Sequence, residues 1–376
     1  MQSYQNYVVS RTIGEYGTFG SFKVGKLPEG CKRCLKGEKV VLYVTGKCTV
    51  GCYYCPIQED RRTDDSIFVN ERKLANDQDL FDENDKCLAT GAGITGGDPM
   101  ETPQRTIEKI KLLKEKYGSD YHLHLYTSGM HLLKNPELAD ELFEAGLDEL
   151  RIHPKNLKTY PVWKFAADLK RRHKEKSIGF EVPAIPHAEE ELERLILFAD
   201  EHHLDFVNLN EFEFTEANFN SLREKGFVSV LHNSAVVSSR ETALNVISKV
   251  KDKTTIPLHF CSSGSKDGIQ LKQRYRRRAK QVKRPFEFVS DEGLLEFARL
   301  TVFDEKDFEL LVSLLKDELE ISDDMYETNK QILSIDIADV IAVEIIEELR
   351  EVMEIQGELI SVFPIADSPI IRSDPL

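Results

Sequence analysis

Short apolar runs alternate with amphipathic segments from Val40 to about residue 214 of the 376-residue chain. Apolar residues three to four positions apart, such as Ile107, Ile110 and Leu113, predict helices because they form one helix face. The apolar runs between them predict strands, so a strand–helix unit repeats. The expected strands are Val40–Thr45, Ala92–Thr95, His122–Thr127, Glu149–His153, Ile178–Ala184 and Phe206–Asn210. The expected helices are Pro103–Tyr117, Pro136–Ala145, Val162–Lys176, Glu189–His202 and Glu216–Lys225.

Six strands joined by right-handed helical crossovers would curve into most of a barrel. We therefore expect an α/β fold, a partial (β/α)6 TIM-like barrel over residues 40–284, with a further strand-like run at Thr255–Phe260. Residues 1–39 are expected to form a cysteine-bearing N-terminal extension. Residues 285–376 read as strand, helix, helix and strand, which predicts a small α+β domain. The acidic tail Ala366–Leu376 is expected to be loosely ordered.

The composition, 41% hydrophobic and 31% charged, is that of a soluble globular enzyme. No apolar run reaches the roughly 18 residues of a membrane span, so no membrane segment is expected. The net charge of −15 disfavours nucleic-acid binding by the whole molecule, but the basic segment 272–284 could face an RNA phosphate. A solvated helix face is the simpler interpretation of that segment. Seven cysteines, an odd number, and no apolar signal segment at the start predict a reducing, cytoplasmic setting.

Three cysteines, Cys48, Cys52 and Cys55, stand in one short loop directly after the first expected strand. Thiolates at this spacing can hold three corners of an iron–sulfur cube and leave the fourth iron open to a small molecule. A structural zinc site is the alternative. It usually draws on two ligand pairs roughly a dozen or more residues apart, so a tight trio fits it poorly.

The second expected strand ends in Gly96-Gly97-Asp98-Pro99, where glycines would let the backbone approach a ligand without a Cβ in the way. In barrels, chemistry gathers at the C-terminal ends of the strands. Polar residues at the ends of the later strands are therefore expected to share one mouth. They are Thr127, Ser128, Arg151, His153, Glu181, Asn208, Asn210 and Glu211.

The cysteine loop, with Tyr54 before its last cysteine and Pro56 after it, resembles the cluster loop of the radical S-adenosylmethionine (radical SAM) superfamily. The glycine turn resembles that family's Gly-Gly-Glu-Pro motif, whose backbone contacts the methionyl amino group. Asp98 stands where glutamate is usual. Residues 93–98 and 207–213 look similar to the archaeal branch related to pyruvate formate-lyase activating enzymes.

This resemblance implies that the three loop cysteines hold a [4Fe–4S] cluster whose open iron binds SAM. An electron from the cluster would then cleave SAM to a 5′-deoxyadenosyl radical. The radical would take a hydrogen atom from a small molecule, a protein side chain such as a glycyl residue, or an RNA base. A flavodoxin- or ferredoxin-like protein is implied as electron donor. The residues implied to contact SAM are Tyr54, Gly96, Gly97, Asp98, Pro99, Thr127 and Ser128.

The candidate catalytic residues are Arg151, His153, Glu181, Asn210 and Glu211. Arg151 and His153 alternate along one strand, so both would face the barrel interior, where buried polar groups need partners. SAM could supply those partners, with Arg151 taking its carboxylate, or these residues could satisfy one another. His153 is expected to donate hydrogen bonds or move a proton rather than bind metal. The rival to an enzyme is a non-catalytic metal- or cluster-bearing scaffold protein on the same barrel.

Four more potential ligands lie outside the loop. Cys31 and Cys34 form a CxxC pair, and Cys261 follows His259 at the end of the last strand-like run. Together they could form a second site, either zinc with a Cys3His set or an auxiliary iron–sulfur cluster. The alternative is a free CxxC pair and a lone buried thiol. Cys87 is expected to pack as a small apolar residue.

Overall fold

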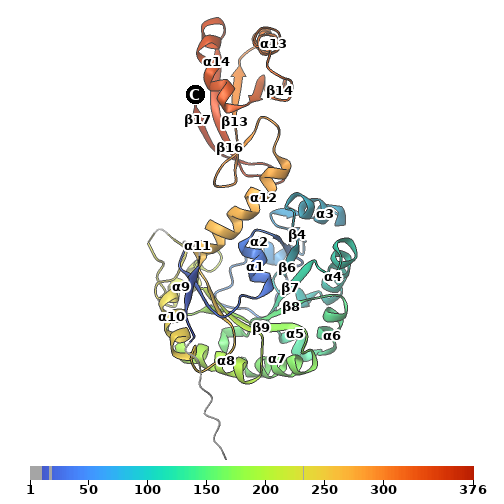
Figure 1. Ribbon diagram of the computed structural model, residues 1–376, viewed down its shortest axis with the longest axis vertical. Helices are drawn as coiled ribbons and strands as arrows, with labels where there is room; N and C mark the ends of the chain where they lie inside the picture. Colours follow the sequence, from blue (N-terminus) through green and yellow to red (C-terminus); the bar gives the residue numbers. More distant parts are fainter. Residues whose placement is uncertain (1–10, 17–18, 232) are drawn as a thin grey trace, which may run out of the picture. The chain divides into compact units, whose positions relative to one another are not determined.

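The computed structural model describes residues 11–16, 19–231 and 233–376, which form two compact units (Figure 1). The first unit runs to Asn84 and resumes over Ala89–Leu271. The second unit combines Asp85–Leu88 with Lys272–Leu376.

The expected boundary after residue 284 differs from the observed one, because helix α12 (Lys272–Val282) belongs to the second unit. Ala279 of this helix is fully buried and packs in one apolar cluster with Phe286 and Leu295. The helix is therefore held by the core that follows it in the sequence.

The first unit is built on an 11-stranded sheet in the order β1-β2-β11-β10-β9-β8-β7-β6-β3-β4-β5. In this spatial order, all neighbouring strands between β11 and β3 run parallel to one another. This confirms the predicted α/β fold with a partial barrel, and all six predicted strands are present. The parallel strands are β3 (Lys39–Tyr43), β6 (Gly91–Thr95), β7 (His122–Thr127), β8 (Glu149–Ile152), β9 (Ser177–Ala184), β10 (Phe206–Glu211) and β11 (Leu258–Cys261).

Residues 1–39 were expected to form an extension, but the described part of this segment belongs to the sheet. Residues 1–10, 17 and 18 of the predicted range lie outside the described residues. Strand β2 (Ser21–Val24) pairs antiparallel with β11 and with β1 (Gly14–Tyr16). Phe22 is fully buried and stacks on Phe260, with ring centroids 4.8 Å apart. This apolar contact makes the segment an edge of the barrel sheet.

The crossover helices alternate with the parallel strands and lie on the outer side of the curved sheet, whereas α1 (Glu29–Leu35) is drawn inside it (Figure 1). Ile107, Ile110 and Leu113 are buried, as their spacing predicted. Helix α10 (Ser239–Val250) completes the last crossover and was not among the expected helices. The other helices are α1 (Glu29–Leu35), α2 (Glu59–Thr63), α3 (Asp77–Lys86), η1 (Pro99–Glu101), α4 (Pro103–Tyr117), α5 (Met130–Lys134), α6 (Glu137–Glu144), η2 (Lys155–Leu157), α7 (Tyr160–Arg172), α8 (Glu189–Glu201), α9 (Phe219–Glu224), α11 (Ser263–Ser265) and η3 (Lys266–Leu271).

Two short strands close the other edge of the sheet. Strand β4 (Phe68–Val69) pairs antiparallel with β3, and β5 (Arg72–Lys73) pairs with β4. Within the described ranges, no helix is both long and apolar enough to cross a membrane.

The second unit is α+β, with a six-stranded antiparallel sheet centred on β13 (Leu295–Val302). The tail was expected to be loosely ordered, and that prediction is wrong: β17 (Ile370–Pro375) pairs with β16 (Ile355–Val362), and the Leu376 amide donates to the Gly357 carbonyl at 2.9 Å. Backbone pairing, which composition does not reveal, orders this acidic segment. The remaining elements are β12 (Phe288–Val289), β14 (Tyr326–Asn329), β15 (Ser334–Ile337), α13 (Glu305–Ser313), η4 (Leu314–Glu318) and α14 (Asp339–Val352).

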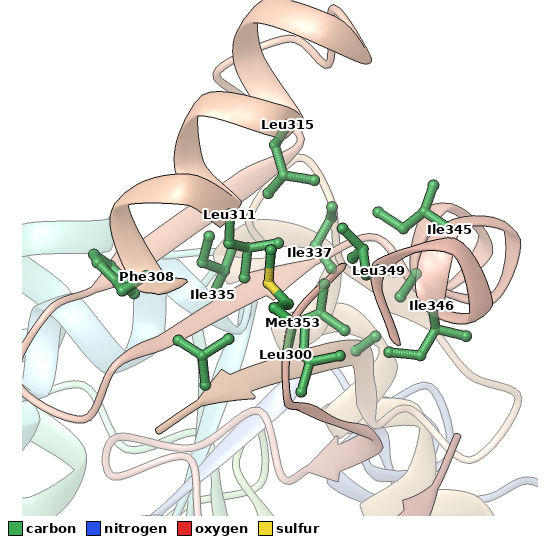
Figure 2. Packing of buried hydrophobic residues seen from close by; sticks show 14 residues of the cluster. Leu300, Phe308, Leu311, Leu315, Ile335, Ile337, Ile345, Ile346, Leu349 and Met353 are labelled. Atoms are coloured by element: carbon green, nitrogen blue, oxygen red, sulfur yellow. The ribbon is translucent and has the colours of Figure 1, made fainter. Parts of the chain in front are cut away.

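Figure 2 shows the apolar core of this second unit, where side chains of the sheet meet the two helices that cover it. Leu300 of β13 and Ile335 of β15 face Leu311 of α13 and Leu349 of α14. Their burial supplies the main driving force for folding of a unit of this size.

We predict that Leu300→Ala destabilises the second unit by about 2–5 kcal/mol, because Leu300 is fully buried and truncation leaves a cavity. Urea denaturation followed by circular dichroism measures the change. Val343→Ala is the matched control, since Val343 on α14 is 55% exposed; its unfolding midpoint should stay near that of the parent. Equal effects of both substitutions would contradict this description of the core.

Candidate active site

One cavity of about 690 Å³ lies at the C-terminal ends of the parallel strands. It brings together nearly all residues that the sequence placed at a site, and Pro99 is the exception among the predicted SAM contacts. The predicted residues that line it are Cys31, Cys34, Cys48, Cys52, Tyr54, Cys55, Gly96, Gly97, Asp98, Thr127, Ser128, Arg151, His153, Glu181, Asn208, Asn210, Glu211, His259 and Cys261.

The three loop thiols of Cys48, Cys52 and Cys55 all open onto this cavity, and none is in a disulfide. Burial raises the pKa of Cys48 and of Cys52, the latter in spite of a hydrogen bond to Tyr54, so ligation would have to displace their protons. In the part of the chain that the structure describes, no three His, Cys, Asp or Glu side chains converge on a single metal ion. This argues against zinc. Three thiols without a fourth ligand fit a four-iron cluster, which holds its ligands on separate irons.

Hydrogen bonds hold the backbone of the cysteine loop in place at several points. The Thr49 amide donates to the Glu101 carboxylate at 2.6 Å, and the Lys155 ammonium donates to the Val50 carbonyl. The Asn218 side-chain amide donates to the Tyr54 carbonyl at 3.1 Å. The loop is thus fixed from three different elements of the barrel before any ligand is considered.

The glycine turn after β6 packs against the start of the cysteine loop. A Cβ on Gly96 would lie 2.4 Å from the Thr45 carbonyl oxygen, and one on Gly97 would lie 2.1 Å from that of Lys47. The amides of Gly97 and Asp98 donate to the Thr45 and Lys47 carbonyls at 2.7 and 2.8 Å. We expected the glycines to make room for a ligand. The structure assigns them a second reason, since they let two backbone segments touch.

The carboxylate of Asp98 joins the ends of β6 and β7. It accepts from the hydroxyls of Thr127 at 2.8 Å and Ser128 at 2.5 Å, and from the amides of Ser128 and Met100 at 3.0 Å each. Asp98 is 1% exposed. With its acceptor positions taken by the chain, its side chain positions the turn, and Thr127 and Ser128 direct their hydroxyls to it.

A second carboxylate, Asp65, supports the same region and was not singled out from the sequence. It accepts from the Arg105 guanidinium at 2.8 and 3.1 Å and from the Thr45 hydroxyl at 2.6 Å, and it pairs with Lys47 at 2.8 Å. Hydrogen bonding to Arg105 is the largest cause that lowers the pKa of Asp65 well below its usual range. Because its partners lie far apart in the sequence, no local motif marks this residue.

The Tyr54 hydroxyl and His153 Nε2 are 2.9 Å apart, and His153 Nδ1 lies 2.9 Å from the Glu181 carbonyl oxygen. Burial lowers the pKa of His153, which favours the neutral ring. A carbonyl can only accept, so Nδ1 carries the proton and Nε2 accepts from Tyr54. His153 therefore holds the aromatic residue of the cysteine loop in place.

Arg151 lies at the centre of a buried ion network. Its guanidinium donates to Glu149 at 2.6 Å, to Glu181 at 2.6 Å and to the Tyr126 hydroxyl at 3.2 Å. We left open whether SAM or neighbouring residues would satisfy Arg151, and the geometry favours the neighbours. Burial alone would raise the pKa of Glu181, but the Arg151 charge and the amides of Asn208 and Asn210 outweigh it and lower that pKa to about 2.

The polar residues at the end of the last of the six predicted strands also contact other protein residues. Glu211 accepts from the amide and hydroxyl of Ser263 at 2.8 and 2.7 Å, which caps the short helix α11. Asn210 donates to Glu181 at 3.0 Å. In contrast, Asn208 Oδ1 and His259 Nδ1 are buried in the cavity wall without a hydrogen-bond partner. The chain itself leaves these two polar atoms unsatisfied.

The predicted second group of thiols lies in the same cavity. Burial raises the pKa of Cys31 and of Cys261 to about 12 each, so both are neutral thiols without a metal. The Cys3His zinc site stays a prediction: among the described residues no three such side chains are placed to hold one metal ion, and His259 Nε2 contacts the Tyr16 hydroxyl.

The basic segment is not a solvated helix face. Arg274 and Arg278 of α12 are 8% and 4% exposed. Arg277 donates to the Cys87 carbonyl at 3.1 Å, and Lys272 pairs with Glu292 at 2.8 Å. These cations serve contacts within the second unit, which removes most of the support for a phosphate-binding surface.

Comparison with known proteins adds to this geometry. The profile of the Radical SAM superfamily matches residues 42–227. A Methanocaldococcus jannaschii protein, named provisionally as a glycyl-radical enzyme activating enzyme, is 35% identical over 362 residues, 93% of either chain. The FeMo cofactor biosynthesis protein NifB of Chlorobaculum tepidum is 28% identical over 109 residues, 28% of this chain and 26% of NifB.

Among solved structures, Streptococcus suis SuiB bound to S-adenosylmethionine aligns with a TM-score of 0.43 and 13% identity. The alignment covers 60% of this chain and 50% of SuiB. A likeness this distant carries no argument about activity.

We predict that Gly97→Ala lowers the iron bound after anaerobic reconstitution, because its Cβ would force the glycine turn away from the Lys47 backbone. Colorimetric iron analysis per chain measures this. Gly14→Ala is the matched control, as nothing lies within 4 Å of a Cβ there. Parent-like iron in the Gly97 variant would show that the contact does not shape the loop.

We predict that Glu181→Gln destabilises the first unit by about 3 kcal/mol at neutral pH, since it breaks a buried ion pair with Arg151. The folded pKa of about 2 lies below the unfolded value, about 4.3. The carboxylate therefore stabilises above the unfolded value, and this is lost as pH falls towards 2. Denaturation of parent and variant between neutral and acid pH should show the difference shrinking below about pH 4.3. Exposed Glu224→Gln should show no such trend.

Proposed function

The chain belongs to the radical SAM superfamily, and from that premise we propose that Cys48, Cys52 and Cys55 hold a [4Fe–4S] cluster at which S-adenosylmethionine is cleaved. The observation that carries the proposal is the opening of all three loop thiols onto one cavity together with the glycine turn and the strand-end polar residues. A cytoplasmic setting, where thiols stay reduced, fits this chemistry.

When bound, such a cluster supplies one electron that splits SAM into methionine and a 5′-deoxyadenosyl radical, which takes a hydrogen atom from the substrate to give 5′-deoxyadenosine and a substrate radical. The electron comes from a reduced flavodoxin- or ferredoxin-like donor. Electrons and atoms are then balanced, because the cleavage of each SAM consumes one electron from the donor and one hydrogen atom from the substrate.

The chain's own residues position these reactants. Lys155, Asn218 and Glu101 hold the cysteine loop, and the neutral His153 holds Tyr54 beside it. Tyr54 packs edge-on against Phe212, with ring centroids 5.7 Å apart, and Tyr54 is only 8% exposed. Apolar packing on this side of the loop excludes water, which protects a radical from quenching.

For the substrate, we propose a glycyl residue of a partner protein. The support is the 35% identity over 93% of the chain to the Methanocaldococcus protein with that provisional assignment. Asn208 lines the cavity and its amide oxygen has no partner in the chain, so a small shift of this side chain would let it accept a hydrogen bond from a backbone N–H of the bound segment. RNA loses support, because the basic segment is used within the second unit.

The cleavage proposal predicts that the dithionite-reduced, anaerobically reconstituted protein converts SAM to 5′-deoxyadenosine. Cys48→Ala should abolish this product, whereas Cys87→Ala, outside the cavity, should retain it. Liquid chromatography with mass detection measures both. Absence of the product with every reductant would favour the non-catalytic scaffold.

The substrate proposal predicts deuterium transfer. Cells of the source organism are grown with Cα-deuterated glycine, and their total protein is freed of small molecules. When this protein is added to the reduced enzyme with SAM, the 5′-deoxyadenosine formed should carry deuterium. If deuterium arrives only from the small-molecule fraction, a small molecule is the substrate and the glycyl proposal fails.

A further inference from the structure

A second trio of cysteines lines the same cavity as the loop trio and is left without a role by the proposed function. Cys31 and Cys34 lie on helix α1, and Cys261 ends strand β11. Cys31 and Cys261 are each 7% exposed, and all three are free of disulfides. Their convergence depends on the antiparallel pairing of β2 with β11, which brings the N-terminal segment to the barrel.

Side-chain amides and a guanidinium contact all three sulfur atoms. The amide of Gln270 spans two of them, since its Oε1 lies 2.5 Å from Cys34 Sγ and its Nε2 lies 3.3 Å from Cys261 Sγ. Cys31 Sγ accepts from Arg151 at 3.4 Å and from the Asn208 amide at 3.5 Å. N–H groups thus donate to the sulfurs of Cys31 and Cys261, the kind of contact that tunes thiolate ligands of iron–sulfur clusters, whereas the Cys34 thiol donates to the Gln270 amide oxygen.

Two polar atoms of residues on the same wall are left unsatisfied by the chain. His259 Nδ1 and Asn208 Oδ1 have no hydrogen-bond partner, although their residues are only 4% and 1% exposed. Lys39 also lines the cavity. Its ammonium contacts His124 Nε2 at 3.1 Å and lies over the Tyr126 ring, and no described carboxylate forms an ion pair with it. A half-buried cation without an anionic partner suits an anionic ligand.

The type of ligand follows from the spacing of the thiols. Neither cysteine trio is placed to hold a single metal ion among the described residues, which disfavours mononuclear zinc for both. A cube of iron and sulfide instead binds thiolates at separate corners. We propose that Cys31, Cys34 and Cys261 hold a second [4Fe–4S] cluster on the wall of the cavity where SAM would bind.

This second cluster lacks a fourth cysteine, because the only other thiols among the described cavity-lining residues are those of the loop trio. The fourth iron would therefore be bound by Gln270, which already contacts two of the three sulfurs, or by a group of the substrate. The chain would carry two clusters around one reaction chamber, each with an iron not ligated by cysteine.

The test uses the full chain, reconstituted with iron and sulfide alone under anaerobic conditions. The parent should hold about eight iron atoms per chain, and a Cys48→Ser/Cys52→Ser/Cys55→Ser variant about four, with a cluster signal by electron paramagnetic resonance after dithionite reduction. A Cys31→Ser/Cys34→Ser/Cys261→Ser variant should also hold about four. Cys87→Ser, outside the cavity, should match the parent.

Because Cys31 and Cys261 are buried, their replacement could disturb folding, so Cys34→Ser alone is included and should lower iron content without changing the circular dichroism spectrum. A folded loop variant with no iron overturns the proposal. Zinc in place of iron, or equal iron in the parent and the Cys34 variant, does so too. The proposed function is judged separately by 5′-deoxyadenosine formation by the parent, so either idea can fail alone.

Discussion

The site depends on one close backbone contact, where the glycine turn after β6 lies against the segment that leads from β3 into the cysteine loop. Gly96 and Gly97 have no side chain, and the backbone carbonyl oxygens of Thr45 and Lys47 occupy the space that a Cβ would need. Hydrogen bonds from Gly97 and Asp98 lock the two segments together. The cysteine loop and the glycine turn are therefore one structural unit, since a shift of either moves the other.

Buried charge provides the second constraint, deeper in the barrel. Arg151 forms ion pairs with Glu149 and Glu181. The side-chain amides of Asn208 and Asn210 also donate hydrogen bonds to Glu181. A buried carboxylate is tolerated only when paired in this way. Most polar residues at the strand ends therefore hold one another in position, and only a few buried atoms, such as Asn208 Oδ1, remain for a ligand.

Local patterns in the sequence were sufficient for much of the fold. The apolar runs of the parallel strands and the helical spacing of Ile107, Ile110 and Leu113 led to elements that the structure contains. The tail after residue 365 and the N-terminal segment were misjudged, because β17 and β2 are ordered by pairing with strands elsewhere in the chain. Such pairing leaves no periodic signal of its own in a short polar strand.

The sequence by itself determined the family, because three cysteines in a short loop and a glycine turn are local features whose spacing carries their meaning. Only the tertiary structure decided which side chains are committed to one another. Asp65, Lys39 and Gln270 acquire their roles from partners distant in the chain. It also decided that Cys31, Cys34 and Cys261 meet in the same cavity as the loop trio, since that convergence needs β2 to pair with β11.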